Sequence, residues 1–253
     1  SVGGVFLALP PLTQNEMILR CLSYSNINLL FLEKPLAHTP EASEKLFDYL
    51  IRSRKLFRIG YIFRYTFWGE QLLSKFEITN EISSLSLNWT FLAHHFRYDL
   101  DNWKRFNKTG GGVIRFYGIH IIALLSEIGY GDVLLSEVSG SSFDESEKWI
   151  AIFSGMDLPP FKVCVDSKSI QNRFNIEYTS SDITPKARTL VNITEPFEFL
   201  AENERLDTNQ RVEVLSKHCK SFDEDGINEY EWYSDTIHLW KKIENKSKYI
   251  AKY

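Results

Sequence analysis

Short apolar runs alternate with amphipathic segments over the first 65 residues of the chain. Residues 5–9, 28–32 and 57–63 are almost continuously apolar, as in strands that are covered on both faces. Thr13 and Thr39 are candidate N-caps of two intervening helices, and Thr39 is followed by the favourable pair proline and glutamate. This alternation predicts an open parallel sheet with helices on its faces.

The pattern changes after residue 65. Residues 82–92 alternate with period two, which predicts a half-buried antiparallel strand. Five further strand candidates are separated by turn residues, at 133–139, 149–154, 161–166, 173–178 and 188–193. They predict a large, mainly antiparallel sheet. Two amphipathic helices, 209–219 and 228 to about 244, close the chain.

A triple glycine, Gly110-Gly111-Gly112, leads into an apolar helix predicted to run for about four turns to Gly129. Glycine at a helix entrance lets backbone N–H groups approach a ligand, and the helix dipole favours an anion there. One interpretation is a ligand across the first turn, with the His120 imidazole one to two turns further in. The other is that the glycines form a turn and that His120 is a hydrogen-bonded core residue.

Composition narrows the classes of function. The chain has 253 residues, is 43% hydrophobic and has a net charge of −4, so it is globular and has no basic surface for nucleic acid. No apolar run reaches the roughly 20 residues of a membrane span, and no signal peptide is found. Three cysteines without metal-type spacing predict reduced thiols in a cytoplasmic protein.

Other chemistries receive little support from the sequence. His94 and His95 with Asp99 and Asp101 form a cluster, but neighbours in an extended segment point to opposite faces, so we predict no metal site. The serines around Gly140 lack the base order of a hydrolase. The acidic residues 223–225 lack the spacing of a calcium loop and predict a turn.

Several motifs together resemble the family of glucose-fructose oxidoreductase, inositol dehydrogenase and rhizopine-catabolism dehydrogenases. They are VFLALPP (5–11), EKPLA (33–37) and GGG-x7-H (110–120), with GY-x2-R (60–64), Arg97 and Trp103 in similar places. The resemblance covers nearly the whole chain. It implies an oxidoreductase that uses NAD or NADP and transfers a hydride to or from a sugar-like or other small carbonyl or imine substrate. It also implies homo-oligomers that form through the antiparallel sheet.

The resemblance also assigns site residues. Lys34 at the cofactor–substrate junction and His120 as acid/base would be catalytic; a lysine cation favours a developing alkoxide, and a histidine carries protons near neutral pH. The cofactor-binding residues would be Leu9, Pro10, Pro11, Glu33, Lys34 and Pro35. We expect Arg64 and Arg97 to anchor an anionic substrate group if they converge, and Tyr117 to contact the substrate.

Three positions depart from the family pattern. Phe116 and Ala123 stand where the family typically or often has aspartates, and Gln14 stands where it usually has a histidine. The loss of both carboxylates predicts a more apolar site, which fits a less polar substrate, a reaction in which His120 acts alone, or no reaction. The alternative function is therefore a non-catalytic family member that binds a ligand or stabilises an oligomer.

The predicted fold is α/β, with a partial Rossmann-type parallel sheet followed by an α+β domain with a large, mainly antiparallel open sheet. Residues 1–65 would be the C-terminal part of a dinucleotide-binding domain, and residues 66–253 a substrate and oligomerisation domain. The glycine-rich turn that binds the dinucleotide phosphates is not found. We therefore expect either a further N-terminal portion or a partner that covers the bare edge of the first sheet.

Overall fold

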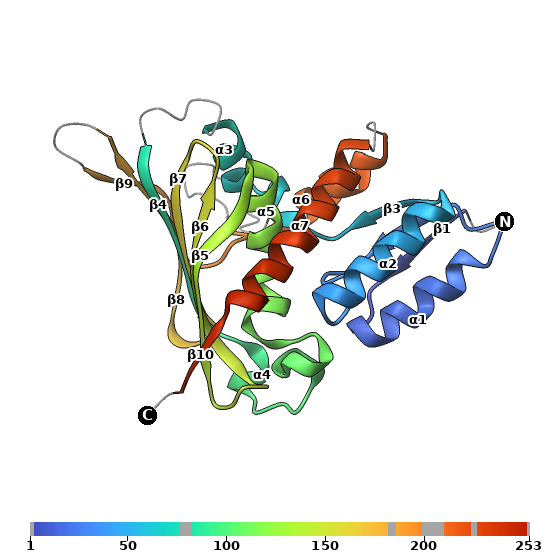
Figure 1. Ribbon diagram of the computed structural model, residues 1–253, viewed down its shortest axis with the longest axis horizontal. Helices are drawn as coiled ribbons and strands as arrows, with labels where there is room; N and C mark the ends of the chain where they lie inside the picture. The colour runs from blue at the N-terminus through green and yellow to red at the C-terminus, as the bar shows by residue number, and fades with distance from the viewer. Residues whose placement is uncertain (1–2, 76–81, 182–185, 199–209, 224–226, 252–253) are drawn as a thin grey trace.

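Two separate sheets organise the chain in a computed structural model that describes residues 3–75, 82–181, 186–198, 210–223 and 227–251. The smaller sheet is parallel and has the order β1-β2-β3. Its strands are β1 (Gly4–Leu7), β2 (Leu29–Leu32) and β3 (Leu56–Ile59), connected by the helices α1 (Pro11–Leu22) and α2 (Pro40–Ser53). Both helices lie on the same side of this sheet (Figure 1). The predicted alternation of strands and helices is confirmed.

The two helix starts differ from each other. Thr39 caps α2 as predicted, because its side chain accepts a hydrogen bond from the Ala42 N–H. The prediction that Thr13 caps the first helix is wrong, since α1 begins at Pro11 and Pro10 takes the cap position. Proline at the first helical position has no N–H to satisfy, so the Pro10-Pro11 pair both ends the strand segment and starts the helix.

The third strand is shorter than predicted. Pairing of β3 with β2 ends where Ile59 meets Leu32, the last residue of β2. With no neighbouring strand left to pair, residues 60–63 leave the sheet, and a 3-10 turn, η1 (Ile62–Tyr65), follows. The side chain of Phe63 is consequently buried against the helix that carries His120 rather than in the sheet.

The larger sheet has seven strands in the order β10-β5-β6-β7-β4-β8-β9. They are β4 (Ile82–Leu92), β5 (Tyr130–Gly140), β6 (Ser146–Gly155), β7 (Leu158–Asp166), β8 (Lys168–Ser180), β9 (Ala187–Ile193) and β10 (Lys248–Ala251). Most neighbours are antiparallel, as predicted, but β4 runs parallel to β7 and β10 runs parallel to β5. The alternating stretch 82–92 forms β4, which has an antiparallel neighbour on one side only.

Five further helices follow the small sheet in the described part of the chain. They are α3 (Phe67–Lys75), α4 (His94–Arg97), α5 (Ile119–Ile128), α6 (Arg211–Lys220) and α7 (Ile227–Lys246). The two predicted C-terminal helices correspond to α6 and α7, with Asn209 outside the described residues. Helix α7 runs diagonally between the large sheet and α2, and it packs on α5 and β5 (Figure 1). It therefore joins the two parts of the molecule.

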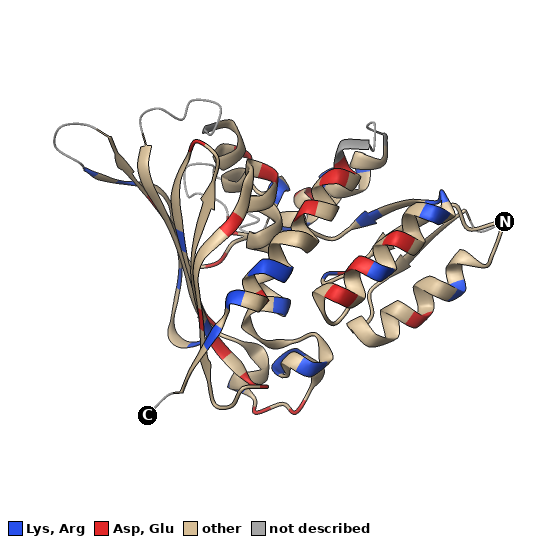
Figure 2. Ribbon diagram, viewed as in Figure 1, with Lys and Arg blue, Asp and Glu red and all other residues tan. Residues whose placement is uncertain are grey.

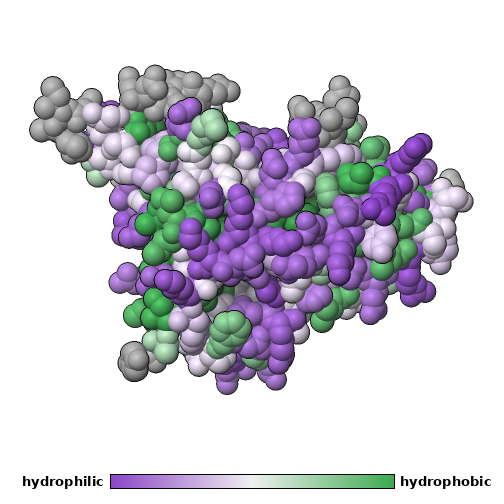
Figure 3. Space-filling view, viewed as in Figure 1, coloured by the Kyte–Doolittle hydropathy of each residue, from purple (hydrophilic) through white to green (hydrophobic). Residues whose placement is uncertain are grey.

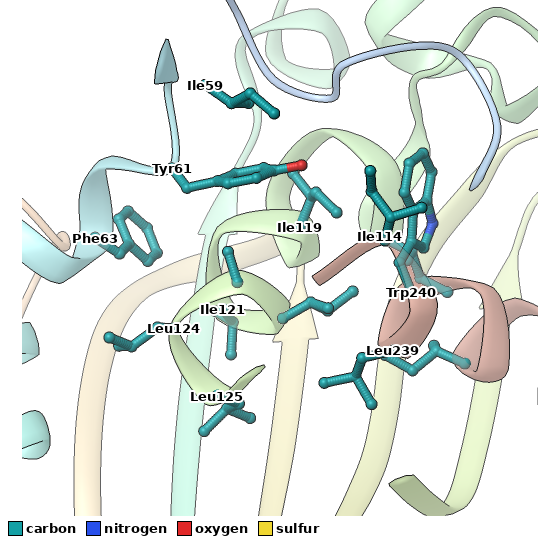
Figure 4. Close-up of a cluster of buried hydrophobic side chains, with 14 of the residues drawn as sticks. Ile59, Tyr61, Phe63, Ile114, Ile119, Ile121, Leu124, Leu125, Leu239 and Trp240 are labelled. Atoms are coloured by element: carbon teal, nitrogen blue, oxygen red, sulfur yellow. The ribbon is translucent and has the colours of Figure 1, made fainter. Parts of the chain in front are cut away.

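The core centres on α5, which is buried on all sides. Ile119, Ile121, Leu124 and Leu125 of this helix lie together with side chains from the β3–η1 connection and from α7 (Figure 4). Those neighbouring side chains are Ile59, Tyr61, Phe63, Leu239 and Trp240. Burying so many aliphatic and aromatic groups is the main source of stability, at roughly 25 cal/mol per Å² of apolar surface.

Charged side chains gather on the outward faces of the helices. Acidic and basic residues both occur along α1, α2 and α7 (Figure 2). Hydrophilic residues correspondingly cover the middle of the face on which α2 and α7 lie (Figure 3). Within the described ranges, no helix combines the length and hydrophobicity that crossing a bilayer requires.

Candidate functional site

A cavity of about 390 Å³ opens at the carboxyl ends of β1 and β2. Ligands of open parallel sheets bind beyond these strand ends. The turn after each strand and the segment 103–116 line the cavity, through Ala8, Leu9, Pro10, Glu33, Lys34, Trp103, Lys104 and Phe116. Four of the residues predicted to bind the cofactor, Leu9, Pro10, Glu33 and Lys34, therefore lie around one space.

Pro11 and Pro35, also predicted to bind the cofactor, are buried and do not line this cavity. Pro11 faces the triple glycine, since a Cβ at Gly110 would lie 2.8 Å from its Cγ. Pro35 follows Lys34 through a cis peptide bond, and its carbonyl lies 3.4 Å from the Gln14 side-chain nitrogen. The two prolines shape the turns that present the lining residues.

Gln14 fixes the turn that carries Lys34. This fully buried side chain extends from the first turn of α1. Its Nε2 donates to the carbonyl oxygens of Glu33 at 2.8 Å and Leu36 at 3.2 Å, and its Oε1 accepts from the Glu33 N–H at 2.9 Å. An amide offers a donor and an acceptor at once, which a neutral histidine also does through two separated nitrogens. Gln14 thus holds residues 33–36 against α1.

Lys34 directs its ammonium toward Phe116. The Nζ donates a 2.6 Å hydrogen bond to the Phe116 carbonyl oxygen and lies 4.0 Å from the centre of the Phe116 ring. Burial lowers the pKa of Lys34 to about 8, the Glu33 carboxylate opposes this shift, and the charge of Lys104 adds to it. An amine with a pKa near 8 can hold or release a proton close to neutral pH.

Phe116 lies in a π-helical turn, η5 (Val113–Gly118), that leads into α5. The sequence predicted one regular helix here, and the wider turn is a difference from that prediction. Turns of this type are rare and are frequent at functional sites because they re-aim neighbouring groups. Here the Phe116 carbonyl accepts from Lys34. In a regular helix this carbonyl would bond the N–H of residue 120.

The glycines ahead of this turn form a loop. Gly110 and Gly112 have φ angles of 89° and 78°, a region that favours glycine. A side chain at Gly112 would collide with Asn107, and the Val113 N–H donates to the Ser146 hydroxyl at 3.1 Å. Since the Ser146 hydroxyl occupies the Val113 N–H at the helix entrance, the structure favours the interpretation in which the glycines form a turn.

His120 lies behind the cavity rather than on its wall. Its side chain is 7% exposed, and its ring stacks on Phe63 with centres 4.6 Å apart. Burial, and secondly the charge of Lys34, lower the pKa of His120 well below its usual value. The imidazole is therefore neutral, and its Nδ1 has no hydrogen-bond partner in the described part of the chain. The charge of Lys34 lowers the pKa of His120, but only Lys34 lines the cavity.

The three residues predicted to bind substrate do not come together. Arg64 forms ion pairs with Glu127 at 2.7 Å and Glu229 at 2.9 Å, so its charge is already neutralised. Arg97 is exposed on α4, which lies at the opposite end of the large sheet from α3, just after Arg64 (Figure 1). The condition under which the two arginines would anchor an anionic substrate group, that they converge, is therefore not met. Tyr117 packs against Phe91 and Phe116, with ring centres 4.7 Å apart in both cases.

The histidine pair occupies a short helix instead of the extended segment assumed from the sequence. His94 is exposed on α4 whereas His95 is buried against Phe96. Burial and nearby cations, Arg105 first among them, lower the pKa of His95 to about 4. Among the described residues, no three side chains of histidine, cysteine or acidic type are grouped to hold a metal ion.

Two larger cavities, of about 580 and 490 Å³, lie along α7. Some of their charged groups form hydrogen bonds within the protein. Lys241, which borders both, donates to Glu44 at 2.7 Å, and Lys242 donates to the Gly131 carbonyl at 2.7 Å. The cavity at the strand ends lies where open parallel sheets bind ligands and is lined by four of the predicted cofactor-binding residues, so it is the candidate active site.

No family model and no curated protein match this sequence. Several solved structures match the fold of this chain. GenD2 from gentamicin A biosynthesis, in complex with NAD, has a TM-score of 0.72 and 14% identity, over 97% of this chain and 76% of that one. KijD10, a 3-ketoreductase from Actinomadura kijaniata in complex with NADP and TDP-benzene, has a TM-score of 0.70 and 15% identity, over 100% and 80%. A Listeria innocua NAD-binding protein has a TM-score of 0.66 and 16% identity, over 97% and 80%.

The chain has the fold of NAD(P)-binding oxidoreductases. This confirms the α/β architecture that the resemblance implied, a small parallel sheet beside a large, mostly antiparallel one. In this oxidoreductase fold, sequence reasoning missed Lys104 as a residue of the cavity. The only available signal was its place next to Trp103, one of the residues that carried the resemblance.

Proposed function

We propose that this protein is an oxidoreductase that uses NAD or NADP to transfer a hydride to or from a small carbonyl or imine compound. The fold and the position of the cavity beyond the strand ends support this proposal. The observation that carries it is Lys34. Its ammonium lies at the wall of the cavity, and the hydrogen bond it makes is to a carbonyl oxygen rather than to a carboxylate.

The lining residues fit a nicotinamide. Ala8, Leu9 and Pro10 supply an apolar wall, Trp103 supplies a flat aromatic surface, and the Glu33 and Lys34 side chains supply polar groups nearby. Such a mixture of apolar walls with few polar groups is typical of cofactor sites. When bound there, a nicotinamide supplies or accepts the hydride. Whether NAD or NADP is used would depend on residues that contact the ribose.

Lys34 would act on the oxygen of the substrate. In the reducing direction, the carbonyl carbon receives the hydride, and the carbonyl oxygen receives a proton from the Lys34 ammonium. In the oxidising direction, the neutral amine takes the hydroxyl proton. A pKa of about 8 suits both directions near neutral pH. The ammonium also stabilises negative charge on this oxygen in the transition state.

His120 would position Lys34 and would not contact the substrate. Its neutral imidazole lies within range of the Lys34 charge and adds no second positive charge. A charged imidazolium there would repel the ammonium and lower the pKa of Lys34 further. We therefore propose that His120 is a positioning residue, in place of the catalytic role that the resemblance implied.

The second candidate function is a non-catalytic protein that binds a ligand in the same cavity. Phe116 and Ala123 favour it. Ala123 is fully buried, and its carbonyl accepts from the Trp232 indole N–H at 2.7 Å, so this position belongs to the core. Neither position offers the carboxylate that could share a proton with His120.

We also propose the remaining features that the resemblance implies. These are a sugar-like substrate, homo-oligomers that pair through the large sheet, a boundary between residues 65 and 66, and a cytoplasmic location. The side chains of Cys21, Cys164 and Cys219 are free thiols, which is compatible with a reducing compartment.

Titration of the protein with NADH and NADPH tests the proposal, followed by a screen of small ketones, aldoses and imines for cofactor oxidation. Replacement of Lys34 by methionine should keep cofactor binding and lower turnover by about 10²- to 10⁴-fold, the usual contribution of a positioned proton donor. The matched variant Lys45→Met, at an exposed position of α2, should behave as the parent. Binding without turnover of any compound would favour the second candidate. No binding of either cofactor would refute the proposal.

A further inference from the structure

We propose that the substrate carries a carboxylate, which binds between the ammonium groups of Lys34 and Lys104. This inference rests on the proposed function and deepens it, because it narrows the class of substrate to acidic compounds: sugar acids and other small keto or hydroxy acids. The argument comes from the charges around the cavity and from the partners that each of them has.

Two lysines face one aromatic ring in this cavity. Lys34 Nζ lies 4.0 Å and Lys104 Nζ 5.2 Å from the centre of the Phe116 ring. An aromatic face attracts cations, but each contact contributes only about 0.5–1 kcal/mol where water has access. The ring therefore contacts both ammonium groups without neutralising either, and the charge of Lys104 acts on Lys34.

The cavity has more positive than negative groups. Glu33 is its one acidic lining residue among the described residues. The Glu33 carboxylate lies 3.2 Å from the Lys34 backbone N–H, which donates to it. With two ammonium groups and one carboxylate, the walls of the cavity have a net charge of +1, so a ligand with a single negative charge balances them.

Several other cations of the protein have acidic partners. Lys168 pairs with Glu147, Lys241 with Glu44, and Arg115 with Glu244. In the described part of the chain, Lys104 has no ion pair, and Lys34 uses one of its three N–H donors, on the Phe116 carbonyl. Two positive groups that share a cavity and retain free donors form a site for an oxyanion.

The residue at position 116 changes what the cavity can bind. From the sequence, Phe116 predicted a less polar substrate. The structure gives this residue another effect, because its ring gathers two cations and adds no negative charge. An acidic side chain here would neutralise one of them. We infer that the substrate itself supplies the missing negative charge.

This arrangement also orients a keto acid for reduction. With the carboxylate near Lys104, the adjacent carbonyl oxygen can approach Lys34. The carbonyl carbon then gains a hydride from the nicotinamide, and the oxygen gains the Lys34 proton. The product is a hydroxy acid, and the neutral Lys34 amine recovers its proton from water. In this step the keto acid is reduced and the nicotinamide is oxidised.

Calorimetric titration with pyruvate and with its neutral amide, pyruvamide, in the presence of saturating NADH tests the charge requirement. We expect pyruvate to bind at least tenfold more tightly than pyruvamide, and Lys104→Met to remove about tenfold of the pyruvate affinity. Lys108→Met is the matched control. Its ammonium also lies over a phenylalanine ring, 5.5 Å from the Phe106 centre, but it pairs with Asp144 at 3.3 Å. This variant should bind pyruvate as the parent does.

Inorganic phosphate provides the second arm of the experiment. Phosphate could bind as tightly as pyruvate and lose as much affinity in Lys104→Met. NADH could also displace pyruvate. Either result would mean that the two lysines form a site for phosphate, and the inference would be wrong. Equal affinity for pyruvate and pyruvamide would also overturn it. In each of these cases NADH binding, measured separately, shows whether the proposed oxidoreductase function survives. Pyruvate binding without NADH binding would instead refute the proposed function, and with it the inference that depends on it.

Discussion

Arg115 in the π-helical turn and Glu244 near the end of α7 form a bidentate ion pair, with both nitrogen–oxygen distances at 2.7 Å. The third guanidinium nitrogen of Arg115 donates to the carbonyl oxygens of His38 at 2.7 Å and Asn107 at 2.6 Å. One side chain therefore joins the turn before α2, the loop before the glycines and α7. Arg115 directly precedes Phe116, whose carbonyl accepts from Lys34.

We expect Arg115→Lys to lower the free energy of unfolding by about 2–4 kcal/mol, because an ammonium cannot form the planar double contact and leaves the carbonyls of His38 and Asn107 without a donor. Urea denaturation measures the loss. Arg188→Lys, at an exposed position of the edge strand β9, is the control and should change the stability by less than about 0.5 kcal/mol. Equal effects of the two changes would show that the Arg115 geometry is unimportant.

Gln14 gives a second prediction. Replacement by leucine keeps the approximate volume but leaves buried backbone groups of Glu33 and Leu36 without their partners. The expected loss of stability is about 2–4 kcal/mol, together with weaker cofactor binding, because the turn that carries Lys34 is no longer fixed. Thermal unfolding and NADH titration are the measurements. The control is Gln71→Leu on the exposed face of α3. Unchanged NADH affinity in Gln14→Leu would separate this turn from the cofactor site.

The fold was largely predictable because local patterns determine it. Each of the five strand candidates after residue 129 lies within a strand of the structure, since alternating side chains match a sheet with one buried face. The four-residue strand β10 escaped prediction because it is defined by its parallel pairing with residues 137–140, far back in the chain. Similarly, β3 stops at Ile59 only because its neighbour β2 ends there.

The site was less predictable because its geometry depends on long-range contacts. Glu33 and Lys34 could be placed at a strand end from the sequence alone. The partners of Arg64 could not, since Glu229 comes from a helix 165 residues further on. Nor does helical spacing reveal that the Phe63 ring stacks on His120 and so removes the imidazole from the wall of the cavity.

Lys34 should reduce the stability of the folded protein. Burial lowers its pKa from 10.5 to about 8, so the folded state disfavours its charge. This cost is present below pH 8 and disappears as the pH rises from 8 toward 10.5, where both states are neutral. We expect Lys34→Met to stabilise the protein at pH 7 by about 1–3 kcal/mol. The variant should also lack the increase in the free energy of unfolding that the parent shows between pH 8 and pH 10.5. Lys45→Met should do neither. A variant less stable than the parent at pH 7 would mean that the Phe116 hydrogen bond outweighs the burial of charge.

Glu127 is a partly buried acid whose pKa is shifted in the opposite direction from that of Lys34. Burial, assisted by Glu229 and opposed by Arg64, raises its pKa from 4.5 to about 7, and one of its carboxylate oxygens has no hydrogen-bond partner within the described residues. The folded state therefore binds a proton more tightly than the unfolded state, so this group's contribution to stability is present below pH 4.5 and is lost as the pH rises through 7. Glu127→Gln keeps the shape and removes the charge.

We expect Glu127→Gln to raise the free energy of unfolding at pH 8 by on the order of 1–3 kcal/mol and to have little effect near pH 4.5. Arg64 retains Glu229 at 2.9 Å, so its own charge stays paired in this variant. Urea denaturation at both pH values gives the two differences. Glu231→Gln is the control, at an exposed glutamate that lines a cavity of about 270 Å³ together with Glu127. If Glu127→Gln destabilises the protein at pH 8, the ion pair with Arg64 outweighs the burial, and the carboxylate is charged in the folded protein at neutral pH.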